Sequence, residues 1–436
     1  MTRRAWWLVG LNILLPGTAQ VLAGNRRLGR FGIVSTFILW IVVIAAVVTM
    51  LVARPVLLTI GTNVVALFVL QVALAFYVVL WIVLTLDTLR LTRLVKTAPS
   101  ARAFIAGLSI AVLVGIAGSA SYGVVIAEST RGVLNDVFAG TKMVDPVDGR
   151  YNILLLGGDA GKHRTGLRPD SMSVVSIDAK SGAATIIGIP RNLQRAPFAK
   201  GSPLYGPYPN GYDCGVDCLV SYLYTYGEEH QDLYPDAKKQ HSNPGIEAMR
   251  DAISGVVGLK LQYYVLIDME GFSDLIDALG GIDIDSTGRY PLGGEEDANH
   301  EPINVDGWIE PGEQHMDGHT ALWYARARHG TTDYDRMKRQ RQVQESILTQ
   351  FDPGNVLTKF QAVAKAGRRV VKTDIPKEML AGFVELSSKT RSIEITKLEL
   401  SPPAVNVIRP DFTAIHSLVK STLKKSIPKP SATPKP

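Results

Sequence analysis

The chain has 436 residues and carries 46 Lys and Arg against 40 Asp and Glu, which gives a net charge of +6 and a pI near 9.1. The positive charge lies at the two ends, because residues 1–127 hold ten basic residues and one acid, and residues 416–436 hold five lysines and no acid. Residues 128–415 carry 31 basic and 39 acidic residues, so most of the polar chain is acidic. This distribution argues against a basic nucleic-acid-binding domain, and the length allows a membrane region followed by one large globular domain.

Three apolar runs without a charged residue are long enough to cross a membrane: Phe31–Ala53, Asn63–Leu86 and Ala103–Ala127. A bilayer core of about 30 Å needs roughly 20 apolar residues in a helix, and helices inside a soluble core rarely stay apolar on all sides for so long. A fourth stretch, Trp6–Ala23, is interrupted by Pro16 and Gly17, which disfavours a straight helix. It could span the membrane, lie at its surface or re-enter it.

The short loops between these runs predict their orientation. Asn25–Arg30 carries three Arg and Thr88–Arg102 carries four cations, whereas Arg54–Thr62 carries one. Because positively charged loops stay in the cytoplasm, the first two loops are expected inside and the third outside. We therefore expect a multi-pass plasma-membrane protein with its membrane region in residues 1–127, a stalk over 128–150 and the rest of the chain outside the cytoplasm.

The two cysteines, Cys214 and Cys218, lie in a loop rich in Gly, Pro, Tyr and Asp. In an oxidising compartment this pair could close a small disulfide loop. Two thiols with no nearby His or second Cys pair make a poor zinc site. The sequence favours the disulfide, and two free thiols are the alternative.

Strands and helices alternate along the exported part. Strands are expected over Tyr151–Leu156, Ser173–Ile177, Ala184–Ile189, Tyr263–Ile267 and Ile282–Ile284. Helices are expected over Pro244–Val257, Met269–Leu279, His319–Ala327 and Tyr334–Phe351. This order predicts an α/β domain over 151–423, in α/β/α layers around a central mixed sheet. The Lys- and Pro-rich tail over 424–436 has no apolar face to bury and is expected to be disordered.

A glycine-rich turn follows the first predicted strand and contains two acids and four cations. Its charged residues are Asp159, Lys162, His163, Arg164, Arg168 and Asp170. Such turns let backbone N–H groups approach a phosphate, and paired Asp can hold Mg²⁺. It is not a P-loop, because Leu156 stands where the first glycine belongs and His163 replaces the Ser or Thr after Lys162. The alternative is a solvated turn.

The densest cluster of cations lies between Tyr324 and Gln342. Arg326 and Arg328 lie at the end of one predicted helix. Arg336, Arg339 and Gln340 share one face of the next, at spacings of three and four residues. Arginine binds phosphate oxygens bidentately and keeps its charge, so this cluster in an acidic domain indicates an anionic ligand. The alternative is a solvated helix with ion pairs. A further cation, Arg191, directly follows a predicted strand, where a lone Arg is usually a surface residue.

These motifs, taken in order, resemble the LytR-CpsA-Psr family. The segments that carry the resemblance are Asn152–Asp159, Arg168–Met172, Ile189–Asn192, Gly271–Asp283, Ala321–Arg328 and Asp333–Gln340. The resemblance covers about residues 150–350 and extends more weakly to about 420. The sequence departs from the family pattern in reading Arg168-Pro-Asp-Ser where Arg-Ser-Asp-Thr is usual, and Pro190-Arg-Asn where Pro-Arg-Asp is usual.

The resemblance implies an exported α/β domain that binds polyprenyl (pyro)phosphate lipids and transfers a glycopolymer from the lipid to peptidoglycan. It implies catalytic roles for Asp159, Asp170 and Arg191, with Mg²⁺ (or Mn²⁺) held by the two Asp. The candidate phosphate- and lipid-binding residues are Arg164, Arg168, Arg191, Arg326, Arg328, Asp333, Arg336, Arg339 and Gln340. A general base for the acceptor hydroxyl would be Asp159 or Asp170, with Asp333 less favoured.

Three functions remain open at this stage. The first is a membrane-anchored glycopolymer–peptidoglycan transferase, with a polyprenyl (pyro)phosphate-linked glycan as donor and peptidoglycan as acceptor. The second is a polyprenyl pyrophosphate hydrolase, which would use the same Arg and Asp. The third is a non-catalytic regulator that binds the lipid or glycan. Transcriptional regulation is disfavoured, because the exported domain is acidic and nucleic acid is not an expected partner.

Overall fold

The computed structural model describes residues 2–138, 143–159, 168–297, 301–350 and 371–428. The chain divides into two compact units, Met1–Gly132 and Val133–Pro436. Each unit is described by itself below.

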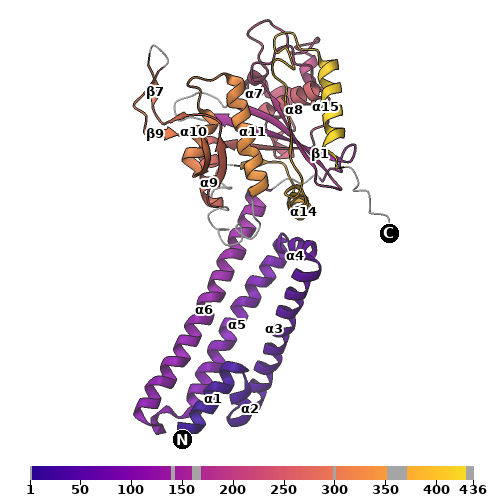
Figure 1. Cartoon of the computed structure of the whole chain (residues 1–436). Helices are drawn as coiled ribbons and strands as arrows, with labels where there is room; N and C mark the ends of the chain where they lie inside the picture. The colour runs from indigo at the N-terminus through magenta and orange to yellow at the C-terminus, as the bar shows by residue number, and fades with distance from the viewer. Residues whose placement is uncertain (1, 139–142, 160–167, 298–300, 351–370, 429–436) are drawn as a thin grey trace, which may run out of the picture. The chain divides into compact units, whose positions relative to one another are not determined.

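The N-terminal unit consists of helices. They are α1 (Thr2–Leu14), α2 (Thr18–Ala23), α3 (Arg26–Val52), α4 (Arg54–Gly61), α5 (Val64–Thr92) and α6 (Pro99–Asp136) (Figure 1). Three apolar helical stretches, Arg26–Val52, Val64–Lys96 and Pro99–Gly132, are long and apolar enough to cross a membrane. They cover the three predicted runs except for the end residues Ala53 and Asn63, and they indicate a membrane anchor.

The ambiguous stretch Trp6–Ala23 forms two short helices, α1 and α2, that break at Pro16 and Gly17. Gly17 has a φ of 100°, which a residue with a side chain rarely adopts. With 13 residues, α1 is about 20 Å long, shorter than the roughly 30 Å of a bilayer core. The fully buried Gln20 of α2 donates hydrogen bonds to the carbonyl oxygen of Leu84 and to Thr88 of α5. Polar contacts therefore fasten this broken pair of helices to α5.

The second unit is built on a six-stranded sheet with the order β11-β4-β1-β2-β3-β12. Its strands are β1 (Arg150–Asp159), β2 (Arg168–Asp178), β3 (Ala184–Ile189), β4 (Tyr263–Asp268), β11 (Val371–Thr373) and β12 (Thr396–Glu399). The pairs β1–β4 and β3–β12 are parallel, and the other neighbours are antiparallel. The α/β fold with a central mixed sheet is thus confirmed.

Helices cover both faces of this sheet. Leu154 and Leu156 of β1 belong to the larger core, which includes α7 (Leu223–Glu229), α8 (Pro244–Val257) and α15 (Phe412–Ser426). Ile153, on the other face of β1, shares a core with Leu380 and Phe383 of α14 (Leu380–Thr390). Because alternate residues of a strand point to opposite faces, the central strands are apolar on both sides.

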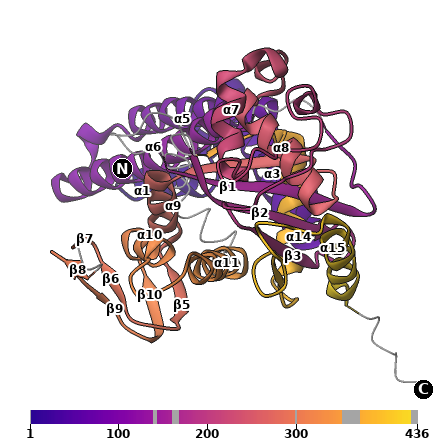
Figure 2. The same ribbon diagram turned by 90° about the horizontal axis from the view of Figure 1, so that it is seen from above.

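A smaller core lies beside the sheet, around α9 (Met269–Leu279), α10 (Gly318–Arg326) and α11 (Asp333–Gln350). It is completed by three strand pairs that gather next to α10 (Figure 2). They are β5 (Ile282–Ser286) with β10 (Gly312–Met316), β6 (Tyr290–Leu292) with β9 (Gly307–Ile309), and β7 (Glu295–Glu296) with β8 (Pro302–Ile303). The predicted strand Ile282–Ile284 therefore belongs to this small assembly rather than to the central sheet.

Short 3₁₀ helices connect the larger elements, at Leu94–Lys96, Pro203–Tyr205, Val220–Tyr222, Gln231–Leu233, Lys238–Gln240 and Lys377–Met379. At the C-terminal end, α15 runs to Ser426, so the first residues of the tail that we expected to be disordered from residue 424 are helical. The physical reason is that Val419 and Leu423 are buried, which holds the last turns of α15 against the domain. Residues 429–436 lie outside the described residues, as does Phe351 at the end of its predicted helix.

Candidate active site

The ends of β1 and β2 bring the predicted aspartates to one edge of the sheet. Gly157 pairs with Ser171 and Gly158 with Pro169, so Asp170 is an extra residue without a partner across the ladder. Such a bulge redirects a side chain, and bulges are common beside active sites. Asp159 pairs with Arg168 at the next position, which places the backbones of both aspartates at this edge.

Part of the predicted glycine-rich turn, including Lys162 and His163, lies outside the described residues. Arg164 lies outside the described residues, and so do the side chains of Asp159 and Arg168. For these three residues the predicted roles stay predictions.

Arg191 connects three elements of the fold. It follows β3, and its Nη1 donates to Oδ1 of Asp170 on β2 at 2.7 Å. Its Nε donates to Oδ2 of Asp333, the first residue of α11, at 3.0 Å. Although burial acts to lower the pKa of Arg191, the hydrogen bonds and charges of Asp170 and Asp333 outweigh it and raise the pKa. This arginine is thus not the surface residue that its position after a strand alone would indicate.

Arg336 lies one turn further along α11 and is buried, with 3% of the residue exposed. Its Nη2 lies 3.4 Å from Oδ2 of Asp333, and among the described residues its buried Nε has no hydrogen-bond partner. Burial is the main cause that lowers the pKa of Arg336, and the positive charges of Arg328 and Arg191 add to it. A desolvated cation with an unsatisfied donor would bind an anion strongly.

Three further predicted residues lie around Arg336. Arg328 is exposed, and its guanidinium forms no hydrogen bond or ion pair with the rest of the described chain. Arg326 is also exposed and stacks over Trp323, with its guanidinium carbon 5.7 Å from the ring centroid. Gln340 donates from Nε2 to the carbonyl oxygen of Ala325 at 3.4 Å.

These side chains open into a cavity of about 720 Å³. One part of its lining is polar and includes three arginines, Arg326, Arg328 and Arg336, beside Asp170, Ser171, His329, Gln340 and Gln344. Two further acids, Asp268 and Glu295, also line the cavity. The walls are largely apolar and come from the sheet and the helices α9, α10 and α11: Leu155, Val265, Ile267, Phe272, Leu275, Leu322, Val343, Ile347 and Leu348. The volume is typical of a small-molecule site. The arrangement suits an amphiphile with a long apolar chain and an anionic head.

A family model, that of the LytR-CpsA-Psr family, matches residues 127–416. The chain belongs to the LytR-CpsA-Psr family. The resemblance that the sequence motifs indicated is therefore confirmed.

Named relatives agree with this membership. A Bacillus subtilis protein named polyisoprenyl-teichoic acid–peptidoglycan teichoic acid transferase TagV is 24% identical over 337 residues, which cover 73% of this chain and 76% of the relative. A transferase of the same kind, TagU from Halalkalibacterium halodurans, is 25% identical over 256 residues, which cover 58% and 69%. The crystal structure of B. subtilis TagV is 22% identical, with a TM-score of 0.45, over 66% of this chain and all of that one.

In this LytR-CpsA-Psr protein, Arg339 has a different environment from the other predicted phosphate ligands. It is buried and is not among the residues that line the cavity. Its Nε donates to the carbonyl oxygen of Tyr324 at 3.0 Å, its Nη2 donates to that of Ala327, and its guanidinium lies 4.3 Å from the ring centroid of Tyr290. Arg339 thus connects α11 to the C-terminal end of α10, where Arg326 is the last helical residue and Arg328 follows it.

An electrostatic interaction between the fully buried Arg341 and the half-buried Glu399 was not identified from the sequence. Arg341 is fully buried and donates to the carbonyl oxygen of Met172 at 3.2 Å and to Oγ of Ser171 at 3.0 Å, next to Asp170. Burial lowers the pKa of Arg341 to about 10, although the charge of Glu399 opposes this change. Arg341 belongs to the sequence cluster, but Glu399 comes from β12 and has no motif that could have indicated the pairing.

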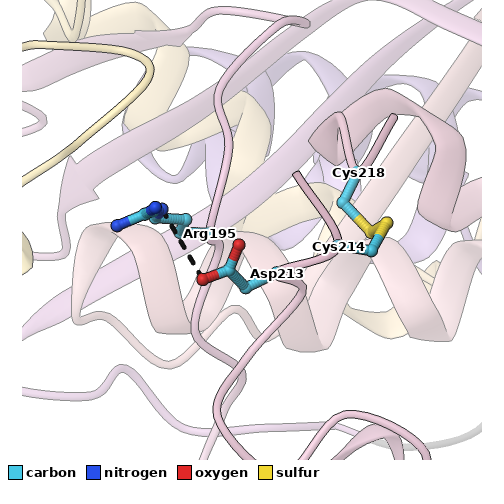
Figure 3. The surroundings of a disulfide bond; sticks show 4 residues. All are labelled: Arg195, Asp213, Cys214 and Cys218. Carbon is cyan, nitrogen blue, oxygen red and sulfur yellow. Dashed lines mark ion pairs between the residues drawn. A yellow bond between two sulfur atoms is a disulfide. The ribbon is translucent and has the colours of Figure 1, made fainter. Parts of the chain in front are cut away.

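Cys214 and Cys218 are joined in a disulfide in the structure (Figure 3). Beside them Arg195 and Asp213 form an ion pair of 3.6 Å. No group of three or more His, Cys, Asp or Glu that could hold a metal ion occurs among the described residues.

Proposed function

We propose that this protein is a membrane-anchored phosphotransferase that moves a glycopolymer from a polyprenyl pyrophosphate carrier to a sugar hydroxyl of peptidoglycan. The observation that carries the proposal is the cavity, whose apolar walls suit a polyprenyl chain and whose cationic part suits a pyrophosphate. The names of the B. subtilis and H. halodurans relatives support the same reaction class.

In this reaction the hydroxyl oxygen of the acceptor attacks the phosphorus that carries the glycan. The bond from this phosphorus to the oxygen bridging the two phosphates breaks, polyprenyl monophosphate leaves, and a base takes the hydroxyl proton. Phosphoryl transfer depends mainly on positioning and on neutralising charge. Arg336, Arg328 and Arg326 would neutralise the phosphates from the cavity lining.

Arg191 and Asp333 are not among the residues that line the cavity, and we propose that Arg191, which contacts Asp170 of the lining, binds an oxygen of the pyrophosphate. Oδ2 of Asp333 already lies 3.0 Å from Arg191 and 3.4 Å from Arg336, so this carboxylate holds the two guanidinium groups in place. Asp170, which lines the cavity, or Asp159 would receive the acceptor proton through a carboxylate oxygen that is not engaged by a metal ion.

The family implies Mg²⁺ or Mn²⁺, for which the carboxylate of Asp170 in the cavity lining is a suitable ligand. Asp159 and Asp170 lie at the ends of neighbouring strands, and Asp170 reaches the cavity. Mg²⁺ is usually held by one or two carboxylates, with phosphate oxygens and water completing the shell. We propose that these two aspartates would hold the cation, which would supply positive charge to the pyrophosphate.

The loops support an extracytoplasmic position for the catalytic unit. Arg26, Arg27 and Arg30 lie at the start of α3, and Arg90, Arg93 and Lys96 lie at or after the end of α5. If these ends are cytoplasmic, α6 leads out of the cytoplasm. A phosphatase that is active only outside the cytoplasm, fused after the last residue, should be active, and activity of a cytosolic reporter would contradict this topology.

The transferase is tested by product analysis. The full-length protein in detergent would receive a polyprenyl-pyrophosphoryl disaccharide labelled in the sugar, together with purified peptidoglycan. We expect label in the peptidoglycan and release of polyprenyl monophosphate. Free glycan phosphate with no labelled peptidoglycan would instead support the hydrolase.

A non-catalytic regulator makes a different prediction. In that case Asp170→Ala and Arg191→Ala would preserve cellular function wherever ligand binding survives. Loss of function in a variant that still binds the lipid would exclude this alternative.

A further inference from the structure

The segment that carries Arg191 is held by a loop that the proposed reaction does not use. This segment, residues 191–196, leaves β3 and runs beside the disulfide loop (Figure 3). The N–H of Ser221 donates to the carbonyl oxygen of Arg191 at 3.3 Å, and that of Val220 donates to Leu193 at 2.9 Å. On the other side, the N–H of Tyr212 donates to the carbonyl oxygen of Ala196 at 2.8 Å.

The disulfide connects these two sides. Cys214 follows Tyr212 by two residues, and Cys218 precedes Val220 by two residues. Cys218 is 1% exposed and belongs to the core cluster that also contains Leu193 and Val220. The covalent bond therefore joins the two stretches of backbone that hold residues 191–196 at either end.

The ion pair between Arg195 and Asp213 adds little to this clamp. Both side chains are more than 40% exposed and their charged atoms are 3.6 Å apart. Exposed pairs of this kind contribute little because solvent screens them. The backbone hydrogen bonds and the disulfide are thus the main connections between the two segments.

We propose that the Cys214–Cys218 disulfide is a positioning element for Arg191, a role that rests on the proposed function of Arg191 at the pyrophosphate. Arg191 must keep one nitrogen 2.7 Å from Asp170 and another 3.0 Å from Asp333. Val220 and Ser221 belong to the short 3₁₀ helix Val220–Tyr222, and their hydrogen bonds to residues 191 and 193 lie outside the sheet, where local opening requires less energy than in the central strands. The Cys214–Cys218 cross-link restricts the open conformations of the loop between Tyr212 and Val220. A displacement of about 1 Å in a catalytic group can lower the rate about a hundredfold.

A purely stabilising disulfide is the alternative, and it predicts a different pattern. It would change the melting temperature of the domain but leave the chemistry of Arg191 in the folded protein unaltered. A positioning role predicts a change at Arg191 under conditions where the protein is still folded.

The first measurement does not depend on activity. Full-length Cys214→Ser/Cys218→Ser protein would be treated with phenylglyoxal below its melting temperature, and modification of Arg191 would be followed by peptide mass spectrometry. We expect Arg191 to react at least about threefold faster than in wild type, since its hold on Asp170 and Asp333 is loosened. Wild-type protein reduced with dithiothreitol should behave in the same way, which covers the case in which the double variant does not fold.

The second measurement is the transfer rate with the labelled polyprenyl-pyrophosphoryl disaccharide. Loss of the disulfide should lower kcat about tenfold or more and change KM for the lipid by less than about twofold, because the lining of the cavity does not include the loop. In Arg191→Lys protein, reduction should lower kcat by a much smaller factor than in wild type, because coupled residues are not additive.

A matched control lies at the tip of the same loop. Val216 is 76% exposed, and Val216→Ala should leave both the reactivity of Arg191 and kcat unchanged. Equal Arg191 reactivity with and without the disulfide, in folded protein, would overturn the inference. A different outcome is that loss of the disulfide speeds the modification of Arg191, but the wild-type protein transfers no glycan. That outcome would contradict the proposed function and leave the positioning role in place.

Discussion

Arg336 and Arg339 lie one turn apart on α11 and both are buried, yet removal of Arg339 should mainly lower stability and removal of Arg336 should mainly weaken ligand binding. Arg339 donates to the carbonyl oxygens of Tyr324 and Ala327. Arg336 has a single ion-pair contact, 3.4 Å from Asp333, and among the described residues its Nε is unpaired. Methionine at either position keeps an unbranched apolar stem and removes only the charge and the donors.

The expected changes in stability follow from these contacts. Arg339→Met leaves two carbonyl oxygens without their donor, and each unsatisfied buried group costs about 1–3 kcal/mol. Arg336→Met removes a cation that burial already disfavours, and replacing such a group by an apolar side chain is often neutral or stabilising. We expect the free energy of unfolding to fall by about 2–4 kcal/mol for Arg339→Met, and by less than about 1 kcal/mol for Arg336→Met.

Ligand binding should show the reverse order. Hydrogen bonds to a charged group contribute roughly 1.5–3 kcal/mol, so loss of Arg336 should weaken binding of a polyprenyl pyrophosphate about 10- to 150-fold. The assay is calorimetry of the full-length protein in detergent with geranylgeranyl pyrophosphate, together with melting temperatures without ligand. Unchanged affinity of Arg336→Met, or a loss of stability as large as that of Arg339→Met, would refute the assignment of Arg336 to the phosphate.

Three further predictions concern the apolar wall of the cavity, the metal ion and Glu399. Ile347→Trp places a larger side chain in the apolar part of the cavity. Isothermal titration should therefore show a much larger loss of affinity for geranylgeranyl pyrophosphate than for the five-carbon dimethylallyl pyrophosphate. Equal losses for the two ligands would contradict binding of the lipid chain in this cavity. Asp170→Asn should raise at least about tenfold the Mg²⁺ concentration for half-maximal binding of geranylgeranyl pyrophosphate, and an unchanged requirement would exclude this carboxylate as a ligand. Burial raises the pKa of Glu399, so the folded domain binds this proton more tightly than the unfolded chain and loses stability as pH rises from about 4.5 through the raised pKa. Melting temperatures measured from about pH 4 to 7 should fall less with rising pH in Glu399→Gln protein than in wild type. The same fall in both proteins would contradict a raised pKa of Glu399.

Local sequence signals were sufficient for several helices of the exported unit. The predicted helix Pro244–Val257 has the same bounds in the structure, because Asn243 accepts a hydrogen bond from the N–H of Ile246 and Pro244 occupies the first turn. Met269–Leu279 also has its predicted bounds, with Asp268 as the N-cap and Gly280 in the left-handed region at the C-terminal end. Each of these signals acts within a few residues, so a single sequence contains it.

The order of strands and the bulge at Asp170 have no such local signal. Ile282–Ile284 alternates like a sheet strand, but its partner is β10, some thirty residues later, and not the central sheet. The bulge arises because β1 and β2 shift register between Gly157 and Gly158. Pairing and register depend on residues far apart in the chain, and periodicity alone does not determine them.

The contacts within the candidate active site also depend on residues far apart in the chain. Arg191 contacts Asp170 and Asp333, which are 21 and 142 residues away, and the family resemblance rather than any spacing grouped them. Helical spacing placed Arg336 and Arg339 on one face, but could not show that Arg339 reaches the end of α10 while Arg336 reaches the cavity. Whether a buried arginine holds a backbone or a ligand is decided by its tertiary partners, which the helical repeat does not specify.

Arg191 and Arg336 differ in how far neighbouring carboxylates neutralise their charges, and this difference affects how a pyrophosphate would bind. In the cavity lining, Arg336 is desolvated and, among the described residues, has an unpaired nitrogen. Arg191 lies behind Asp170 of the lining and is already neutralised by two carboxylates. An entering phosphate gains most at Arg336, since no carboxylate has to be displaced from its Nε. Arg191 can bind a phosphate oxygen only by giving up part of its contact with Asp170 or Asp333, and the same exchange frees carboxylate oxygens of Asp170 for other partners. We infer that Arg336 binds the phosphate first and that Arg191 responds, which is why the position of the Arg191 backbone should matter more for kcat than for KM.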